Sequence, residues 1–463
     1  MPDAPLMIGI SGLRGHIGAS LTPPLVVRYA AAIGACFRAA APAGTPHARL
    51  VLGRDSRPSG QMIELAAAAG LVATGAHVTC LGIASTPAVA VAAVAHHAHG
   101  GLVITASHNP IIWNGVKALR HDGVAPPPEQ ARDIIDRFHA DRVDYAPVEN
   151  LLPLTHDDTA AAVHVRRVLE QVDVPLIRKA RLKVVVDSVH GAGGPEAALL
   201  LDELGVERVH LYAEPTGRFP HPPEPVREHL TELAAAVRQH GAAVGFAQDP
   251  DADRLALVDD RGVYIGEEYT LALGALHVLA RSAAAVGEKR CVAANLSTSR
   301  MLDDIAAAAG VTVIRTPVGE ANVAAAMQKH GCIVGGEGNG GVILPPVTLV
   351  RDSLVGMALV LELIAQRGKP LSAITAEVPS YAIVKQKMDV QPGLAPRLPE
   401  LLGNATDATH VDTQDGVRLD WPDRWVHVRP SNTEPIIRVI AEARDESTAN
   451  KLIARVRDVL AKA

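Results

Sequence analysis

Short apolar runs alternate with alanine-rich stretches along the first 370 residues or so of the chain. Apolar runs of this length are typical of buried strands, and the alanine-rich stretches between them have the length of crossover helices. The pattern therefore predicts α/β units built on mostly parallel sheets. In the first unit we expect strands at 49–54, 77–82 and 101–105 and helices near 22–40, 59–74 and 87–98.

The same rhythm occurs twice more and then changes. The second unit has expected strands at 183–187, 206–212 and 242–247 and helices near 194–204 and 226–240. The third has strands at 290–294, 311–315 and 332–335 and helices near 267–282, 299–309, 320–330 and 353–367. After about residue 372, strands near 381–390, 409–419, 424–429 and 435–442 and a helix from Ser447 indicate a small α+β domain. Polar stretches at Asp144–Asp158 and around Gly368 are the expected linkers, and the predicted domains are 1–150, 151–258, 259–370 and 371–463.

Composition narrows the class of protein. The 463 residues are 48% apolar and 20% charged, which is typical of a globular chain. A formal charge of −6, with no block of like charges, disfavours nucleic acid as a partner. No basic, apolar leader and no run of about 18 apolar residues is present, which predicts a cytoplasmic protein that does not span a membrane.

Cysteines and a histidine cluster predict no metal centre. Cys36, Cys80, Cys291 and Cys332 form no C-x-x-C pair, so we expect neither a disulfide framework nor a thiolate zinc site, in keeping with a reducing cytoplasm. The cluster His96-His97-Ala-His99 lies at a predicted helix end without acidic companions, and we interpret it as a solvated turn.

The sharpest local motif is Thr105-Ala-Ser-His-Asn-Pro110, directly after an apolar strand. The end of such a strand is where an α/β protein presents reactive groups. Ser107 would lie on a tight turn beside His108, with Lys117 ten residues further on. A Ser-His hydrolase is disfavoured because the G-x-S-x-G elbow is absent and neighbouring side chains on an extended turn point apart. Arg54, Asp55 and Arg57 are expected to form a supporting salt-bridge network under this turn.

A second motif, Asp249-Pro-Asp-Ala-Asp-Arg254, lies between two apolar runs. Carboxylates at alternate positions of an irregular loop can converge on one hard cation, and oxygen ligands favour Mg²⁺ over zinc. An EF-hand is disfavoured because Arg254 stands where that loop needs glycine and strands are expected on both sides. A solvated acidic turn is the alternative for the three aspartates alone.

Two further loops could bind hydroxyl and phosphate groups. Gly335-Gly-Glu-Gly-Asn-Gly-Gly341 lets backbone approach a ligand, and Glu337 and Asn339 can bond to hydroxyls; a plain glycine turn is equally open. Arg429-Pro-Ser-Asn-Thr-Glu-Pro-Ile-Ile-Arg438 offers a guanidinium fork and turn amides for a phosphate, with a solvated turn as the alternative. The side chains proposed for this second loop are Arg429, Ser431, Asn432, Thr433 and Arg438.

Taken together and in this order, the four loops resemble those of the α-D-phosphohexomutases, which interconvert sugar 1-phosphates and 6-phosphates. The resemblance covers essentially the whole chain. It implies three similar α/β domains with mixed sheets and a C-terminal α+β domain around a central cleft. It also implies a phosphoserine at Ser107 and Mg²⁺ held by that phosphate with Asp249, Asp251 and Asp253.

The same resemblance implies the reaction and its other participants. Phosphate passes from Ser107 to the sugar, a bisphosphorylated sugar forms and turns over, and its other phosphate returns to the serine. Lys117 is implied in proton transfer, His108 and Arg14 are placed with the catalytic residues, and Arg254 with those that bind substrate. A sugar 1,6-bisphosphate is the implied activator, and the protein is expected to be a monomer or homodimer whose partner is a small-molecule sugar phosphate.

Substrate choice depends on two variant loops. Gly336-Glu-Gly-Asn-Gly340 stands where many members have Glu-x-Ser, and Thr316-Pro-Val-Gly-Glu320 replaces a common Gly-His. Both variants resemble phosphoglucosamine mutases, so this is the predicted activity, with phosphomannomutase/phosphoglucomutase as the alternative. A sugar-phosphate phosphatase and a non-catalytic sensor are the remaining rivals, and the intact Ser107, Lys117 and three aspartates argue against the sensor.

Overall fold

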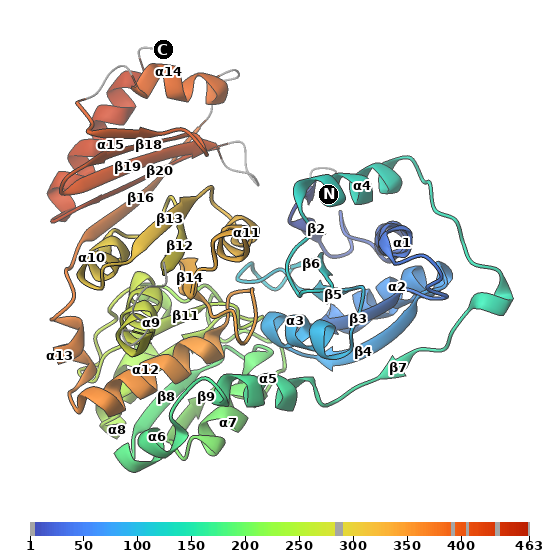
Figure 1. Cartoon of the computed structure of the whole chain (residues 1–463), viewed down its shortest axis with the longest axis horizontal. Coiled ribbons are helices and arrows are strands. Elements are labelled where there is room, and N and C mark those ends of the chain that lie inside the picture. The colour runs from blue at the N-terminus through green and yellow to red at the C-terminus, as the bar shows by residue number, and fades with distance from the viewer. Residues whose placement is uncertain (1–4, 283–289, 390–393, 404–406, 431–435, 462–463) are drawn as a thin grey trace. The chain divides into compact units, whose positions relative to one another are not determined.

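The computed structural model describes residues 5–282, 290–389, 394–403, 407–430 and 436–461 (Figure 1). The chain folds into two compact units, one formed by Met1–Gly274 with Asn339–Ser372 and the other by Ala275–Gly338 with Ala373–Ala463. Each unit contains helices and mixed or antiparallel sheets. The α/β fold class is therefore confirmed, while the central cleft implied by the resemblance stays a prediction.

A seven-stranded mixed sheet organises the N-terminal part of the first unit, with the order β1-β2-β6-β5-β3-β4-β7. Strands β3 and β4 and strands β3 and β5 pair in parallel, whereas β6 and β2 run antiparallel to their neighbours. The strands are β1 (Leu6–Gly9), β2 (Gly12–His16), β3 (Arg49–Arg54), β4 (His77–Ile83), β5 (Gly100–Ile104), β6 (Trp113–Arg120) and β7 (Thr155–His156). The helices are α1 (Pro23–Ala40), α2 (Gly60–Ala73), α3 (Thr86–Ala95) and α4 (Pro128–His139).

Alternating side chains of strand β3 show why its central residues 50–52 are all apolar. Leu50 and Leu52 belong to the core shared with α1 and α2, whereas Val51 belongs to the core shared with α3. Helices therefore cover both faces of the sheet, as Figure 1 shows. A strand buried on both faces has no solvent side, so it appears in the sequence as a continuous apolar run. This burial holds the carboxyl end of β5, where Ser107 follows, on a rigid frame.

The second sheet of this unit has the order β11-β10-β8-β9. Strands β10 and β11 form an antiparallel pair, so residues 249–254 make the connection at the carboxyl end of β10. The strands of this sheet are β8 (Lys183–Asp187), β9 (Glu207–Leu211), β10 (Val244–Gln248) and β11 (Leu255–Val258). Strand β15 (Gly341–Ile343), later in the chain, is not part of it. The helical segments are α5 (Ala160–Leu169), α6 (Val174–Ala180), α7 (Gly193–Glu203), η2 (Arg227–His229), α8 (Thr231–His240) and α12 (Ser353–Arg367), while α9 (Glu268–Arg281) leads into the second unit.

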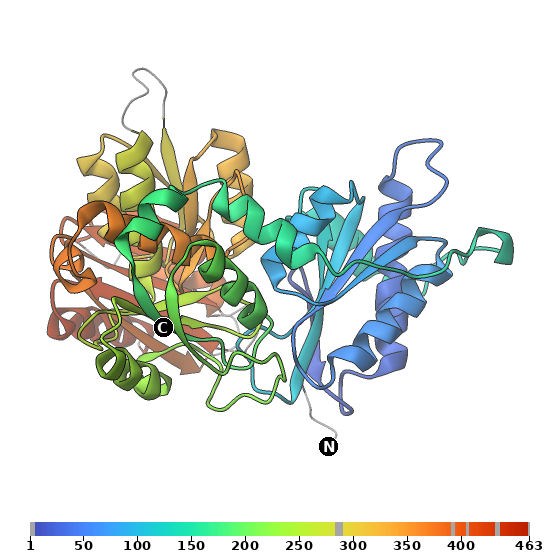
Figure 2. The same cartoon turned by 90° about the horizontal axis from the view of Figure 1, so that it is seen from below.

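An extended segment joins the two sheets of the first unit. It contains the short helix η1 (Val148–Asn150), and its strand β7 pairs with β4 at the edge of the first sheet. Figure 2 shows this segment running from α4 past β4, with η1 projecting from the rest of the unit. The linker predicted at Asp144–Asp158 falls on this segment.

The second unit carries a parallel set of strands followed by an antiparallel sheet. Strand β12 (Cys291–Asn295) pairs in parallel with β13 (Thr312–Thr316) and β14 (Val334–Glu337), and α10 (Met301–Ala308) and α11 (Glu320–His330) are the crossover helices. The C-terminal sheet has the order β16-β20-β19-β18-β17. Its strands are β16 (Ala382–Asp389), β17 (His410–Asp412), β18 (Val417–Trp421), β19 (Arg424–Pro430) and β20 (Ile436–Ala443), accompanied by α13 (Leu371–Thr375), η4 (Ala395–Arg397), α14 (Leu398–Gly403) and α15 (Glu446–Leu460).

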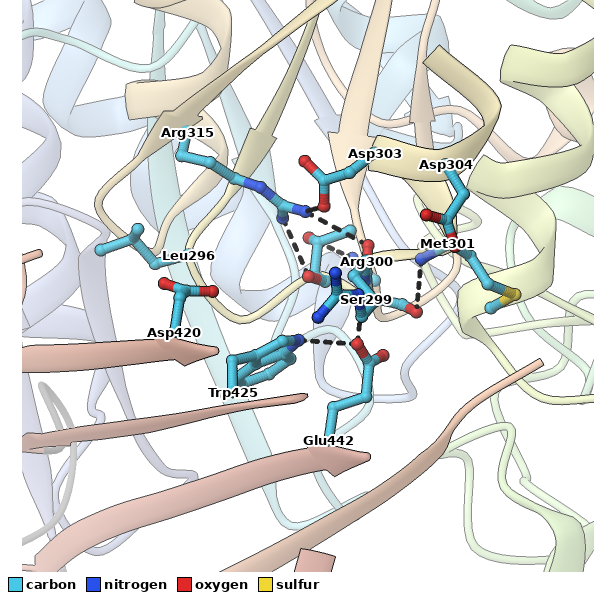
Figure 3. A network of polar contacts seen from close by, with 12 residues as sticks. Leu296, Ser299, Arg300, Met301, Asp303, Asp304, Arg315, Asp420, Trp425 and Glu442 are labelled. Atoms are coloured by element: carbon cyan, nitrogen blue, oxygen red, sulfur yellow. Dashed lines mark hydrogen bonds and ion pairs between the residues drawn. The ribbon is translucent and has the colours of Figure 1, made fainter. Parts of the chain in front are cut away.

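Buried polar groups join the β12–α10 connection to the C-terminal sheet (Figure 3). The Arg315 guanidinium donates to the carbonyl of Thr298 at 2.8 Å and to the carboxylate of Asp303 at 2.5 Å. The Glu442 carboxylate accepts from the backbone N–H of Arg300 at 3.0 Å and from Nε1 of Trp425 at 2.7 Å. Because Glu442 and Trp425 are fully buried, their bond holds this part of the sheet in a defined geometry.

Most predicted elements are confirmed within a few residues, and three are wrong in detail. The helix expected near 226–240 is the short helix η2 followed by α8, which begins at Thr231. The helix expected near 87–98 ends at Ala95. The strand expected over 409–419 is two strands, β17 and β18, because Gly416 adopts a φ of +69° in the turn between them.

Two expectations about cysteine and histidine side chains are corrected. Cys291 and Cys332 form a disulfide with a Cα–Cα distance of 4.6 Å, although 41 residues separate them in sequence. They meet because β12 begins at Cys291 and β14 follows just after Cys332, and these strands are neighbours. His96 also has an acidic partner, since its Nε2 lies 2.6 Å from Oδ2 of Asp157. Within the described residues, no helix is both long and apolar enough to cross a membrane.

Close packing of α1 against α2 depends on Gly70 and yields a prediction. A Cβ at Gly70 would lie 2.3 Å from the backbone oxygen of Val27. Gly70→Ala should therefore lower the free energy of unfolding by about 1–3 kcal/mol, because the cost of overpacking exceeds alanine's better helix propensity. Thermal unfolding measures the effect.

Gly274→Ala in α9 is the matched control, because the nearest atom to its added Cβ would lie 3.5 Å away. We expect this control to be neutral or slightly stabilising. Equal unfolding temperatures for Gly70→Ala and the wild type would contradict the packing argument.

Candidate active site

Ser107 occupies a tight turn just beyond strand β5. Its φ of +49° is uncommon for a residue with a side chain. The turn is closed by a bond from the N–H of Asn109 to the carbonyl of Ala106 at 3.1 Å, and the N–H of Ser107 donates to Oγ1 of Thr105 at 2.8 Å. These bonds stabilise the left-handed backbone conformation of Ser107.

Arg57 holds this turn through hydrogen bonds to its backbone, and we call this arrangement the arginine clamp. Its guanidinium donates to the carbonyls of Ser107 at 2.6 Å, Asn109 at 2.7 Å and Pro110 at 2.9 Å. Nε of Arg57 also bonds to Oδ2 of Asp55 at 3.0 Å, and both side chains are fully buried. The predicted supporting network is thus confirmed for Asp55 and Arg57, whereas Arg54 pairs with Glu64 on α2 at 2.9 Å.

The three aspartates of the β10–β11 connection come together beside the serine. Oxygens of Asp249, Asp251 and Asp253 lie within 4.8 Å of one another, and all three side chains are buried. Oγ of Ser107 donates to Oδ2 of Asp249 at 2.9 Å, across 142 residues of sequence. The flanking strands also confirm that this loop is not an EF-hand, whose loop connects two helices.

The aspartates fit a hard divalent cation. Oδ1 of Asp251 and Oδ1 of Asp253 are buried without a hydrogen-bond partner. Burial, and then the neighbouring Asp253 and Asp251 carboxylates, raise the pKa of Asp249 well above its usual range. Carboxylate oxygens are the ligands that Mg²⁺ prefers, and a bound cation would satisfy the two unpartnered oxygens and offset the repulsion. Asp249, Asp251 and Asp253 are therefore the residues that could hold it.

Several cationic side chains surround the aspartates. Nζ of Lys117 lies 3.1 Å from Oδ2 of Asp251, and Nη2 of Arg351 lies 2.5 Å from Oδ2 of Asp253. Burial by itself would raise the pKa of Asp251, but Lys117 and the hydroxyl of Thr86 lower it below its usual range. Nε of Arg254 is buried without a hydrogen-bond partner, 3.8 Å from Oδ1 of Asp253. An anion entering here would meet fixed positive charge.

His108 and Arg14 lie next to the serine turn. Nδ1 of His108 lies 3.4 Å from Oγ of Ser107, and Nη1 of Arg14 donates to Oδ1 of Asn109 at 2.8 Å. The positive charge of Arg254, then burial and Arg14, hold the pKa of His108 well below its usual value. The imidazole is therefore neutral at pH 7 and adds no charge to the site.

Glu337 and Asn339 belong to different units. Oε1 of Glu337 accepts from Nδ2 of Asn295 at 2.7 Å and from the N–H of Gly319 at 3.1 Å, all within the second unit. Arg315 in turn donates to the carbonyl of Asn295 at 2.9 Å, which ties Glu337 to the network of Figure 3. Asn339 belongs to the first unit, and its Oδ1 is buried without a hydrogen-bond partner.

The C-terminal loop is described only at its two ends. Nε of Arg429 donates to Oδ2 of Asp415 at 2.7 Å, and Arg438 lies opposite Arg429 in the β19–β20 register. The same oxygen of Asp415 accepts from the N–H of Val318 at 3.0 Å. The predicted residues Ser431, Asn432 and Thr433 lie outside the described residues.

Sequence reasoning missed several residues that contact the predicted ones. Thr86 donates from Oγ1 to Oδ2 of Asp251 at 2.7 Å, and Arg351 pairs with Asp253. Asn295 and Asp415 orient Glu337 and Arg429. Thr86 does carry a weak signal, because Ser85-Thr86-Pro87 is a helix start and a helix start follows the carboxyl end of a strand. An isolated arginine or asparagine carries no such signal.

Comparisons with known proteins agree with this geometry. Four family models match: Phosphoglucomutase/phosphomannomutase alpha/beta/alpha domain I over residues 6–143, domain II over 162–262 and domain III over 267–381, and the C-terminal domain over 381–459. The chain is 36% identical to a probable phosphoglucosamine mutase of Methanopyrus kandleri, covering 98% of this chain and 97% of that one.

Two further proteins are similar along their whole length. A phosphoglucomutase/phosphomannomutase of Thermococcus kodakarensis is 36% identical, with 96% of each chain covered. The crystal structure of a phosphoglucomutase/phosphomannomutase family protein from Burkholderia thailandensis has a TM-score of 0.85 at 28% identity and covers 98% of each chain.

The arginine clamp yields a prediction for the serine turn. Arg57→Lys keeps the charge, but one ammonium cannot replace a planar fork that reaches several carbonyls. Each buried carbonyl left without a donor costs about 1–3 kcal/mol, so the turn should open more often. Amide hydrogen exchange in the peptide 105–113 should become at least about tenfold faster, the factor that corresponds to roughly 1.4 kcal/mol.

Arg49→Lys is the control for this measurement, because Arg49 is exposed and its Nη2 donates to the carbonyl of His97, away from the turn. Unchanged exchange in Arg57→Lys would show that the clamp does not hold the turn.

The unpartnered aspartate oxygens predict a stabilising metal. Adding Mg²⁺ should raise the unfolding temperature, and at one hundred times its dissociation constant the gain is about 2.7 kcal/mol. Chelation should reverse the gain. The double variant Asp249→Asn/Asp253→Asn should lose the response, while Asp423→Asn, an exposed aspartate elsewhere, should keep it. An equal Mg²⁺ response in the double variant would place the metal outside this loop.

Proposed function

Because the chain belongs to the phosphoglucomutase/phosphomannomutase family of phosphohexomutases, which are isomerases, we propose that it is a phosphoglucosamine mutase. It would interconvert glucosamine 6-phosphate and glucosamine 1-phosphate. The observation that carries the chemistry is the 2.9 Å bond from Oγ of Ser107 to Asp249, which places a hydroxyl at the edge of a buried carboxylate cluster.

Ser107 is the proposed phosphate carrier. In the forward transfer the bond between phosphorus and Oγ of Ser107 breaks and a bond to the sugar hydroxyl oxygen forms. The hydroxyl proton passes to Oγ of Ser107, with Lys117 as the proposed proton carrier. The return transfer, from the other end of the bisphosphorylated sugar, reverses these bonds. As an ammonium, Lys117 would give a proton to Oγ of Ser107 as the bond to phosphorus breaks and would take the sugar hydroxyl proton in its place. Its Nζ lies 3.1 Å from Asp251, and the side chain is only partly exposed.

Positive charge is the second requirement of phosphoryl transfer. Arg14, Arg254 and Arg351 supply part of it around the serine turn. When bound by Asp249, Asp251 and Asp253, Mg²⁺ would offset the negative charge on the transferring phosphoryl oxygens. His108, whose Nδ1 lies 3.4 Å from Oγ of Ser107, would orient the Ser107 hydroxyl.

Substrate recognition is proposed for the remaining loops. A sugar that presents first one end and then the other needs a fixed site for the phosphate that is not reacting. Arg429 and Arg438, with Ser431, Asn432 and Thr433, are proposed for that phosphate, and Glu337 and Asn339 for the hydroxyls. The support is chemical: guanidinium groups bind phosphate oxygens and carboxylate or amide groups bind hydroxyls. A sugar 1,6-bisphosphate is the proposed activator, because it would phosphorylate Ser107.

The choice of glucosamine phosphate is supported by the names of relatives. Proteins named probable phosphoglucosamine mutase include those of Methanopyrus kandleri and of Methanothermobacter thermautotrophicus, the latter 35% identical over 463 residues. The similarity to a phosphoglucomutase/phosphomannomutase at 36% identity favours glucose or mannose phosphate as the second candidate. We also propose domain boundaries near residues 150, 258 and 370, a cytoplasmic enzyme, and a monomer or homodimer.

A substrate panel tests the proposed specificity. The 1-phosphates of glucosamine, glucose, mannose and N-acetylglucosamine are each supplied with Mg²⁺ and a sugar bisphosphate, and kcat/KM is compared. Glucosamine 1-phosphate should give the highest value. A higher value for glucose or mannose would select the second candidate, and release of inorganic phosphate without isomerisation would select a phosphatase.

Ser107→Ala tests the carrier. Turnover should fall below detection while the unfolding temperature stays near that of the wild type, because the hydroxyl is removed without disturbing the Arg57 bonds to the backbone. Intact-mass measurement after incubation with the bisphosphate should show one added phosphoryl group in the wild type and none in Ser107→Ala. Ser447→Ala, an exposed serine, is the control. A phosphorylated and active Ser107→Ala protein would disprove the assignment.

A further inference from the structure

A fully buried histidine lies between two carboxylates, away from the groups assigned above. Nε2 of His164 on α5 lies 2.7 Å from Oδ2 of Asp352, and Nδ1 lies 3.2 Å from Oε2 of Glu196 on α7. The exposed fractions of the three side chains are 0%, 0% and 2% for His164, Asp352 and Glu196. The three residues come from separate parts of the first unit.

The two short contacts favour an imidazolium at His164. A neutral imidazole carries one N–H and could donate to one carboxylate, which would leave the other ring nitrogen facing an acceptor. Burial by itself would lower the pKa of His164, but Asp352 and Glu196 raise it to about 10. A protonated ring donates to both carboxylates at once, so it links α5 to α7 and to the residue that begins α12.

One of these carboxylates leads to the aspartate loop through α3. Glu196 accepts from the N–H of Ser85 at 3.0 Å and from its hydroxyl at 2.6 Å, and Oγ of Ser85 caps α3. The next residue, Thr86, donates from its N–H to the carbonyl of Asp251 at 2.9 Å and from Oγ1 to Oδ2 of Asp251 at 2.7 Å. The position of Glu196 therefore sets where Thr86 meets the loop.

The other carboxylate leads to the same loop through the start of α12. Asp352 caps α12 by accepting from the N–H groups of Leu354 and Val355. Its two chain neighbours both bond to the loop: Arg351 pairs with Asp253 at 2.5 Å, and the N–H of Ser353 donates to the carbonyl of Ala252 at 3.2 Å. His164 thus joins the two arms that hold the aspartate loop from either side.

We propose that His164 is a positioning residue for the metal site, which fixes the Asp249–Asp253 loop through Glu196–Ser85–Thr86 on one side and through Asp352 with its neighbours Arg351 and Ser353 on the other. This inference rests on the proposed function in one respect, the binding of a divalent cation by the aspartates. Groups that orient metal ligands typically change metal affinity 10–100-fold when they are altered. Loss of His164 should therefore weaken the binding of the metal ion and leave the binding of sugar phosphate unchanged.

Direct metal binding tests the proposal without any sugar. Mn²⁺, a paramagnetic substitute for Mg²⁺, is titrated into the full-length protein and free Mn²⁺ is measured by electron paramagnetic resonance, well below the unfolding temperature. His164→Gln should bind Mn²⁺ about tenfold more weakly than the wild type. His427→Gln is the matched control, because His427 is also fully buried but bonds to Ser297 and to the carbonyl of Asp415 in the other unit. The Mn²⁺ affinity of this control should be unchanged.

Turnover measurements distinguish positioning of the metal site by His164 from a merely structural role. High Mg²⁺ should restore the rate of His164→Gln, and its KM for sugar phosphate should stay near that of the wild type. If His164→Gln fails to fold, the double variant His164→Gln/Glu196→Gln, which also removes one of the two carboxylate charges that His164→Gln leaves unpaired, replaces it in both measurements. An Mn²⁺ affinity within twofold of the wild type in the folded variant overturns the proposal.

The outcomes separate this inference from the proposed function. If the wild type binds Mn²⁺ and loses it in Asp249→Asn/Asp253→Asn, the metal part of the proposed function is upheld whatever His164→Gln does. If the wild type binds no Mn²⁺, both the metal assignment and the His164 proposal fail. Turnover of sugar phosphates is measured independently and decides the mutase activity.

Discussion

The arrangement of segments in the first unit depends on how the charges of three buried aspartates are balanced. Oxygens of Asp249, Asp251 and Asp253 lie within 4.8 Å of one another. Three carboxylates so close, in a medium of low dielectric constant, repel one another strongly. The chain supplies counter-charges from distant segments, Lys117 on β6 and Arg351 before α12. Because two of the aspartate oxygens still lack partners, the loop is suited to a further cation.

Residues 339–372 belong to the same compact unit as the N-terminal part of the chain, and their contacts with the aspartate loop contribute to this. Arg351 and Ser353 both bond to the aspartate loop, and α12 contributes a helix that is buried along most of its length. Burial of that helix gives the free energy, whereas the polar contacts at its start decide where it sits. A shift of α12 would leave Asp253 without its arginine.

Sequence reasoning predicted the features that are local in the chain. Strands β3, β5 and β10 were predicted from their apolar runs, and the positions of Ser107 and the aspartates followed from their places directly after strands. Strands β1 and β2 were missed because Gly9, Gly12 and Gly15 interrupt any apolar pattern there, and the β5–β6 pairing was missed because Trp113–Arg120 alternates irregularly between polar and apolar residues.

Long-range partners were not predictable in the same way. The pairing of Cys291 with Cys332, and of His96 with Asp157, depends on which strands and helices become neighbours, and no spacing rule encodes that. Likewise, 165 residues separate Thr86 from Asp251 and 188 separate His164 from Asp352. A single histidine in a helix gives no sign in the sequence that it bridges two carboxylates.

Both units orient a chemically important side chain with buried polar groups, and energetics suggests why. Replacing a buried ion pair or network by apolar residues is often neutral or stabilising, so Arg57 and His164 are poorly explained by a contribution to stability. The Arg315–Asp303 pair is partly exposed and therefore also adds little to stability. The donors of these three cationic side chains instead meet specific carbonyl or carboxylate oxygens that belong to the serine turn, to the two arms of the aspartate loop and to Asn295 beside Glu337. Apolar side chains could pack equally well at these positions. They would not select one backbone conformation for the serine turn, the aspartate loop or Asn295. Phosphoryl transfer tolerates little misplacement, so we expect these polar side chains to matter more for orientation than for stability.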